Sequence, residues 1–263
     1  MGAFNVENME MAQAVIEAAE ETEAPVILQT TPSTLKYAGL DLYFAIISAI
    51  AKNAKVPVAM HLDHGSSFEL CAQALRAGYT SIMIDGSKLQ LDENIALTKR
   101  VVEMCRPAGV PVEGEIGIVG GKEDETISEN AVYTDPADAL RFEKETGLSS
   151  MAVGVGTAHG VYKKTPVLNV ELISTLKGIL AVPMVLHGSS GLTDETVKDC
   201  IRRGMCKVNF ATELRIAYTD GIRETISMDA DVFDPKAYGR IGRERVKEIV
   251  KARIITCGCA GKA

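Results

Sequence analysis

Short apolar runs alternate with helix-patterned segments along the whole chain, and this alternation restricts the fold more than any other feature. The runs are apolar on both faces, as in Val26-Ile27-Leu28, which is typical of parallel strands that helices cover. The pattern predicts strands at residues 2–6, 26–31, 58–63, 81–85, 110–117, 150–156, 183–189 and 207–211. It predicts helices at residues 7–23, 40–54, 67–77, 91–105, 136–146, 170–180, 194–203, 213–228 and 237–256.

Eight strands that alternate with helices indicate a parallel sheet. In a chain of 263 residues, such a sheet closes most economically into a (β/α)8 barrel, also called a TIM barrel. An open doubly wound sheet is the competing fold, but it usually carries a Gly-x-Gly-x-x-Gly turn after its first strand. The segment Gly154-Val155-Gly156 lacks the third glycine. No Pro-, Gly- or Ser-rich linker divides the chain, so we expect a single α/β domain over residues 1–263.

The composition excludes several classes of protein. With 28 Lys and Arg against 35 Asp and Glu, the net charge is −7, which argues against a nucleic-acid binder and against an anionic membrane surface as partner. The apolar runs are far shorter than the roughly 20 residues of a membrane span, and residues 1–5 do not begin a signal peptide. Six cysteines without a secretory signal are typical of reduced thiols, so we expect a cytoplasmic protein.

One polar interval, residues 117–134, interrupts the alternation of strands and helices. It contains Gly120-Gly121-Lys122-Glu123-Asp124-Glu125 and is too long for a minimal connection between a strand and a helix. Long loops in compact domains are usually lids or binding loops, and we expect this interval to form one.

All four histidines fall at the ends of predicted strands. His61 and His64 lie at the end of the third strand, and His159 follows the sixth. His187 lies near the end of the seventh. The carboxyl ends of barrel strands converge on one rim, so these separated strands deliver imidazoles to one place. Three imidazoles with one open position are a catalytic zinc arrangement, while His61 is equally compatible with packing or with support of a ligand.

Acidic residues collect at the same rim. Asp63 directly precedes His64, and Asp85 ends the fourth predicted strand. Glu113 and Glu115 share one face of the fifth, because side chains alternate along a strand with a period of two. A single carboxylate at a strand end is usually a helix cap or an ion-pair partner, but several beside a metal favour proton transfer or a second metal position.

The last two predicted strands end in small polar residues, in His187-Gly188-Ser189-Ser190-Gly191 and in Asn209-Phe210-Ala211-Thr212. Their backbone N–H groups and hydroxyls are hydrogen-bond donors. Barrels frequently bind phosphate beyond strands seven and eight, at a helix N-terminus, although ordinary turn chemistry also uses these residue types. At this rim the pattern predicts a phosphate site.

In this order the motifs resemble the class II, metal-dependent ketose-bisphosphate aldolases, a family that includes fructose-bisphosphate and tagatose-bisphosphate aldolases. The resemblance extends from Phe4-Asn5 to Cys257-Gly258-Cys259-Ala260-Gly261. Seven segments carry it, at residues 61–65, 83–87, 112–117, 120–124, 156–160, 186–191 and 207–213. Their order is highly specific for the family and discriminates poorly among sugars.

The resemblance implies a zinc-dependent lyase of glycolysis or sugar catabolism. Such an enzyme reversibly cleaves fructose 1,6-bisphosphate or tagatose 1,6-bisphosphate to dihydroxyacetone phosphate and glyceraldehyde 3-phosphate. The resemblance implies that His64, His159 and His187 hold the zinc. Asp85 and Glu115 would line a second divalent-metal position. A monovalent cation, Na⁺ or K⁺, is often found near the histidine–glycine turns of this family.

The resemblance also implies which residues move protons and bind substrate. Asp63 would be the acid/base at the C4 hydroxyl, which must lose its proton in cleavage. Glu123, on a mobile loop, would move the proton at the dihydroxyacetone-phosphate carbon. The phosphate and ketone fragment would contact small and polar residues, namely Asn5, Gly160, Gly188, Ser189, Ser190, Asn209, Phe210, Ala211 and Thr212.

One feature departs from the usual family pattern, and others give conflicting indications of which sugar the protein would prefer. The family usually has a helix before the Phe4-Asn5 strand, and we expect that helix to be missing here. Ala211 is similar to tagatose-type members, whereas residues 61–69 and Arg243 are more similar to fructose-type bacterial enzymes. We expect either that Arg243 reaches the 6-phosphate bound by a neighbour in a homodimer or homotetramer, or that it is an exposed helix residue.

Three other functions compete with this interpretation. A Schiff-base aldolase needs a lysine inside the barrel near the rim, but Lys207 starts its predicted strand, and Lys88 and Lys122 fall in loops. A non-catalytic sugar-phosphate-binding protein is disfavoured because Asp63 and Glu123 accompany the three histidines. A metal-dependent phosphosugar epimerase on the same scaffold would interconvert ketose phosphates without releasing a triose.

Overall fold

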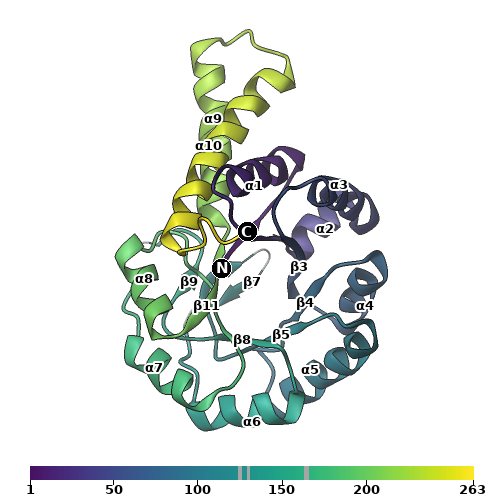
Figure 1. Ribbon diagram of the computed structural model, residues 1–263, viewed down its shortest axis with the longest axis vertical. Helices are drawn as coiled ribbons and strands as arrows, with labels where there is room; N and C mark the ends of the chain where they lie inside the picture. Colours follow the sequence, from purple (N-terminus) through teal and green to yellow (C-terminus); the bar gives the residue numbers. More distant parts are fainter. Residues whose placement is uncertain (124–125, 129–130, 163–165) are drawn as a thin grey trace.

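A computed structural model describes residues 1–123, 126–128, 131–162 and 166–263, without the side chains of residues 122, 123 and 126–128. Eight parallel strands close into a barrel, in which each strand pairs with the next barrel strand along the chain and β1 also pairs with β11 (Figure 1). The barrel strands are β1 (Gly2–Asn5), β2 (Val26–Thr30), β3 (Val58–Gly65), β4 (Ser81–Ile84), β5 (Val112–Ile116), β8 (Ser150–Val153), β10 (Met184–Leu186) and β11 (Met205–Phe210). The predicted (β/α)8 barrel is therefore confirmed.

Helices surround the barrel, and α9 and α10 lie side by side and project beyond the ring that the other helices form (Figure 1). The α-helices are α1 (Met9–Glu21), α2 (Pro32–Ala38), α3 (Leu40–Lys52), α4 (Phe68–Ala77), α5 (Leu91–Cys105), α6 (Pro136–Thr146), α7 (Val170–Ile179), α8 (Asp194–Arg203), α9 (Thr212–Met228) and α10 (Pro235–Thr256). A 3-10 turn, η1 (Arg106–Ala108), follows α5. Among the described residues, no single helix is long and apolar enough to cross a membrane; α2 and α3 meet that test only as a pair, bent by 102°.

Local signals place the helix ends. The Ser67 hydroxyl accepts a hydrogen bond from the backbone N–H of Leu70 and caps α4, and Gly78 ends that helix in the left-handed conformation with φ of 109°. The Asp135 side chain caps α6 in the same way, ahead of a proline at the first helical position. These signals are local in sequence, which is why the predicted bounds of α6 and α8 are also the observed ones.

The interior of the barrel is unusually polar. Barrel interiors are ordinarily filled by bulky apolar side chains. Here Met83, Ala152 and Val185 form a small apolar cluster of their own, and other inward positions carry charged and amide groups that hydrogen-bond across the barrel. These buried polar side chains are Asn5, Gln29, His61, Asp63, Glu113, Glu115, His187, Lys207 and Asn209, each at most 8% exposed.

Two parts of the sequence prediction were wrong. The segment that forms α2 was not predicted to be helical, although Pro32 at its first position is a helix-start signal. The interval 117–134 was predicted to be a loop, but it contains β6 (Gly120–Glu123) and β7 (Thr126–Ser128), which pair antiparallel. β6 also pairs in parallel with β9 (Ala158–His159), a strand outside the barrel. Polar composition concealed this small sheet, because its segments lack the apolar alternation by which strands are recognised.

The packing of α6 on the barrel makes a stability prediction. Phe142 on α6 is fully buried, and a Cβ added at Gly114 of β5 would lie 3.1 Å from its ring. Truncation of Phe142 to Ala leaves a cavity in this layer, so we expect the free energy of unfolding to fall by about 3–5 kcal/mol. Chemical denaturation of the purified protein measures this loss. The control Tyr37→Ala, at an aromatic side chain that is 89% exposed, should change it by less than about 0.5 kcal/mol.

Candidate metal centre

Three histidine rings from different parts of the chain meet at the carboxyl end of the barrel. The ring centroids of His64 and His187 are 4.6 Å apart, and those of His64 and His159 are 5.1 Å apart. His159 and His187 are separated by 5.9 Å. One ring nitrogen from each can be chosen so that all three lie within 4.8 Å of one another. The structure therefore brings together the three histidines that the sequence analysis singled out as metal ligands.

Carboxylates orient two of these rings. His64 donates its Nδ1–H to Asp85 at 2.9 Å, and His187 donates its Nε2–H to Glu113 at 3.0 Å. The opposite ring nitrogens, His64 Nε2 and His187 Nδ1, are buried and have no hydrogen-bond partner within the described part of the chain. A histidine that binds a metal usually gives its other N–H to a carboxylate or a carbonyl in this way. The two free nitrogens fit metal ligands.

The charge of the cluster also fits a cation. His64, Asp85 and Glu115 form a second group whose donor atoms lie within 4.8 Å of one another. Burial disfavours a charged His187, but the neighbouring Glu113 and Glu115 carboxylates outweigh burial and raise the pKa of His187 to about 9. Burial likewise opposes charge on His64, but Asp63 and Asp85 raise its pKa well above the usual value. The carboxylates thus favour positive charge here, either protons on the rings or a bound metal ion.

The backbone at His64 is unusual. His64 has a φ of +48°, in the left-handed region that non-glycine residues seldom adopt. The pairing of β3 with β4 shifts register between Leu62 and Gly65, on either side of this residue. A Cβ added at Gly65 would lie 2.4 Å from the backbone oxygen of Met83, so only glycine fits there. This irregular strand end aims both Asp63 and His64 at the site, although neighbours in a regular strand point to opposite faces.

Asp63 lies in a cradle of side-chain amides. Its Oδ2 accepts hydrogen bonds from Asn5 Nδ2 at 2.8 Å and from Gln29 Nε2 at 3.2 Å. Its Oδ1 accepts one from Asn209 Nδ2 at 3.1 Å. Burial opposes the charge of this carboxyl, but His64, His187 and Lys207 outweigh burial and lower the pKa of Asp63 to about 2. Asp63 is therefore held as a carboxylate in a fixed orientation.

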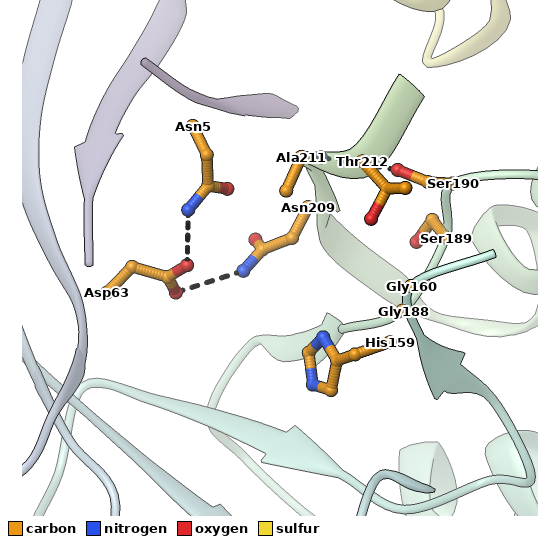
Figure 2. Close-up of a pocket in the computed structure, with 10 residues that line it drawn as sticks. All are labelled: Asn5, Asp63, His159, Gly160, Gly188, Ser189, Ser190, Asn209, Ala211 and Thr212. Atoms are coloured by element: carbon orange, nitrogen blue, oxygen red, sulfur yellow. Dashed lines mark hydrogen bonds between the residues drawn. The ribbon is translucent and has the colours of Figure 1, made fainter. Parts of the chain in front are cut away.

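A pocket opens above Asp63 between the ends of the strands. Figure 2 shows Asp63 bonded to Asn5 and Asn209, with His159 beside them and the Gly188–Ser190 turn on the opposite wall. The lining residues are Asn5, Asp63, His159, Gly160, Gly188, Ser189, Ser190, Asn209, Ala211 and Thr212. All but Asp63 and His159 were predicted to bind substrate, and those two were predicted as acid/base and metal ligand.

Two small-residue turns form the wall opposite Asp63. A Cβ at Gly188 would lie 2.7 Å from the backbone oxygen of Ala158, and the φ of Gly188 is +65°. Tyr162 ties the turns together, since its hydroxyl donates to the Gly188 carbonyl at 2.7 Å and accepts from the Ala158 N–H at 2.9 Å. The Ser190 hydroxyl accepts from the Ala211 N–H at 3.2 Å, where α9 begins. Sequence analysis missed Tyr162, because nothing in its local pattern shows this contact.

The hairpin of β6 and β7 is attached to a candidate ligand. Gly121 of β6 pairs with His159 of β9, and a Cβ at Gly121 would lie 2.2 Å from the His159 carbonyl oxygen. The φ of Gly121 is +87°. Glycine is therefore required where the hairpin meets the His159 backbone. The predicted catalytic Glu123 lies two residues further along β6, but its side chain lies outside the described part of the structure.

Two predicted site residues do not reach the pocket. Phe210 is fully buried and stacks on Phe4 at 5.7 Å between ring centroids, so its side chain packs away from the pocket. Arg243 lies on α10 and faces α1. It donates a hydrogen bond to Gln13 Oε1 at 2.9 Å and forms an ion pair with Glu17, and both partners belong to α1. That Arg243 reaches a phosphate bound by a neighbouring subunit stays a prediction.

A second buried network, centred on Lys207, reaches His187 through Glu113, and sequence analysis did not predict it. Lys207 was expected at the start of its strand. β11 begins at Met205, however, and Lys207 lies inside the barrel. Its Nζ lies 2.9 Å from Glu113 Oε2 and 3.4 Å from His61 Nε2. Burial and the Lys207 charge lower the pKa of His61 to about 3, so its ring is neutral. Lys207 is absent from the pocket lining and is ion-paired with Glu113. That it forms no Schiff base stays a prediction.

Comparison with known proteins identifies the family to which this chain belongs. A sequence profile described as fructose-bisphosphate aldolase class-II matches residues 1–262. The chain therefore belongs to the class II fructose-bisphosphate aldolase family, whose members are lyases acting on small sugar phosphates and are generally metal-dependent.

Solved structures agree with this assignment. The YdjI aldolase from Escherichia coli K12 is 37% identical, with a TM-score of 0.89 over 100% of this chain and 93% of that one. A putative fructose-1,6-biphosphate aldolase from Coccidioides immitis is 28% identical, with a TM-score of 0.92 over 100% and 92% of the two chains. Fructose-bisphosphate aldolase from Campylobacter jejuni, at 24% identity, shares the fold with a TM-score of 0.84 over 100% and 91%.

The contact between Gly121 and His159 makes a testable prediction. Gly121→Ala places a methyl group against the His159 carbonyl, so we expect β6 to separate from β9. Hydrogen exchange at the backbone of residues 120–121 should accelerate. Aldolase turnover should fall on the order of 100-fold, because small displacements of positioned groups have effects of this size.

Gly109→Ala is the matched control for this substitution. Gly109 also has a positive φ, of +66°, but nothing lies within 4 Å of the added Cβ. This variant should keep the turnover and the exchange rates of the parent protein. Normal exchange and turnover in Gly121→Ala would show that the hairpin does not depend on this contact.

Proposed function

We propose that this chain is a zinc-dependent ketose-1,6-bisphosphate aldolase. It would cleave fructose 1,6-bisphosphate or tagatose 1,6-bisphosphate reversibly to dihydroxyacetone phosphate and glyceraldehyde 3-phosphate, in glycolysis or sugar catabolism. One observation carries the proposal: two buried ring nitrogens, His64 Nε2 and His187 Nδ1, have no hydrogen-bond partner in the described part of the chain. Both rings lie beside His159, which lines the same pocket as Asp63. His64, His159 and His187 would hold the zinc, and Asp85 with Glu115 would offer a second divalent position.

Each group in the pocket has a distinct task in this reaction. When bound, the zinc ion acts as a Lewis acid that stabilises the negative charge developing on the ketone oxygen. Asp63 accepts the proton of the C4 hydroxyl in cleavage and returns it in condensation. The three amide donors hold the Asp63 carboxylate in one orientation before substrate arrives. Glu123 would move the proton at the dihydroxyacetone-phosphate carbon.

The wall of the pocket opposite Asp63, which two turns of small residues form, suits a phosphate group. Gly160, Gly188, Ser189 and Ser190 offer backbone N–H groups and hydroxyls there, and α9, a helix of 17 residues, begins at Thr212. A helix N-terminus favours an anion because its first N–H groups are unpaired and its dipole is positive.

Metal removal tests the proposal most directly. Treatment with EDTA should lower triose-phosphate release at least about 100-fold, because a Lewis acid contributes several kcal/mol to such a step. Added Zn²⁺ should restore it, and borohydride should trap no adduct on Lys207 or any other lysine. The coupled triose-phosphate assay is run with fructose and tagatose 1,6-bisphosphates side by side, and the ratio of kcat/KM values identifies the preferred sugar. Full activity in EDTA, or a trapped adduct, would contradict the zinc mechanism.

The role of Asp63 has a separate test. Asp63→Asn keeps the shape of the side chain but removes its ability to take a proton, so kcat/KM should fall by about 10²–10⁴. Its zinc content, measured by atomic absorption, should equal that of the parent. Asp199→Asn is the control: this partly exposed carboxylate on α8 pairs with Arg202 and lies outside the pocket lining, so turnover should be unchanged. Turnover that survives in Asp63→Asn would remove this residue from the mechanism.

A further inference from the structure

Lys207 is the least expected charge in the barrel. Its side chain points into the interior, is only 9% exposed, and occupies a layer that apolar side chains ordinarily fill. Transfer of an ammonium group from water to such a place is costly unless good partners surround it. Lys207 is not part of the pocket lining and contacts none of the three candidate ligands in the described hydrogen bonds. The pocket itself therefore gives no reason for its presence.

The contacts of Lys207 lead to a candidate ligand through one carboxylate. Glu113 uses its two oxygens in different directions: Oε2 lies 2.9 Å from Lys207 Nζ, and Oε1 accepts the His187 Nε2–H at 3.0 Å. Because both oxygens are engaged, the Glu113 carboxylate is fixed in rotation. The His187 ring is then fixed as well, with Nδ1 directed at the group formed by His64 and His159.

Other neighbours of Lys207 hold its ammonium in place. His61 Nε2 lies 3.4 Å from Lys207 Nζ, and His61 Nδ1 lies 2.8 Å from Ser81 Oγ. A neutral His61 ring accepts at Nε2 when its Nδ1–H is donated to Ser81. Lys207 thus contacts two groups anchored on β3 and β5, on the opposite side of the interior from its own strand.

We propose that Lys207 is a positioning residue for the metal: it clamps Glu113, which in turn holds the His187 ring with Nδ1 toward the ion. This inference rests on the metal part of the proposed function. The contrasting role is purely structural, in which Lys207 and Glu113 only fill the barrel. The two roles differ in one measurable property, the metal affinity of the folded protein.

The first variant is Lys207→Met, which removes the ammonium but keeps most of the side-chain length. Without its clamp Glu113 no longer holds one orientation, so we expect Zn²⁺ affinity to fall by about 10- to 100-fold, the range typical when a residue behind a metal ligand is lost. Affinity is measured on metal-free protein by competition with a chromophoric chelator. With Co²⁺ as the probe, the visible absorption bands should also change, because they report the geometry of the ligand set.

A double variant keeps the test valid if Lys207→Met does not fold. Lys207→Met with Glu113→Gln removes both charges of the Lys207–Glu113 ion pair, so neither partner is left charged without the other. If Lys207 acts through Glu113, the double variant and the single Glu113→Gln variant should bind Zn²⁺ with affinities equal within about twofold, both weaker than the parent. Further weakening by Lys207→Met in the Glu113→Gln background would overturn the proposed route.

Controls separate the possible failures. Lys198→Met, at an exposed lysine on α8, should keep the Zn²⁺ affinity and Co²⁺ spectrum of the parent. Lys207→Met with parental affinity and spectrum, or with tighter binding, would overturn the inference, and a lower melting temperature of the metal-free protein alone would then assign Lys207 a structural role. If the parent and Lys198→Met both fail to bind Zn²⁺, the proposed function itself fails.

Discussion

Burial of carboxylates inside the barrel is the constraint on which the rest of the site depends. Asp63, Glu113 and Glu115 are each at most 2% exposed, and an isolated carboxylate in such a place is strongly destabilised. Asp63 is compensated by amide donors, and Glu113 by Lys207 and His187. Glu115 differs, because its Oε2 has no hydrogen-bond partner within the described residues. That oxygen lies 3.2 Å from His187 Nδ1, which also lacks a hydrogen-bond partner. A cation between them would satisfy both atoms at once.

The fold and the rim residues were predictable because their signals are local. Strands buried on both faces produce apolar runs, and helix caps such as Ser67 and Gly78 are read directly from the sequence. The convergence of strand ends then places His64, His159 and His187 together without any knowledge of long-range contacts. His64 shows the limit of this reasoning, since its left-handed backbone and the irregular end of β3 are set by pairing with β4.

The groups that were missed depend on contacts between distant parts of the chain. Lys207 was placed at the start of its strand because that strand was predicted to begin at residue 207, whereas β11 begins at Met205. Strand boundaries are the least reliable part of such a prediction, and this error of two residues moved Lys207 out of the barrel. Tyr162 acts through the backbone of Ala158 and Gly188, which nothing in its own neighbourhood indicates. The β6–β7 hairpin is polar, so its strands lack the apolar alternation by which strands are recognised.

The three candidate ligands are supported in different ways. His64 lies in the barrel strand β3, and His187 directly follows the barrel strand β10. Asp85 orients the ring of His64 and Glu113 that of His187, so the sheet and these two carboxylates set their positions. His159 belongs to β9, which pairs with β6 and not with the barrel. Its backbone is held by the glycine contact at Gly121 and by Tyr162 beside Ala158. A displacement of β6 therefore bears on the backbone of one candidate ligand and not on the strands that carry the other two, so the strand of Glu123 and the geometry of the candidate metal site are linked through Gly121 and His159.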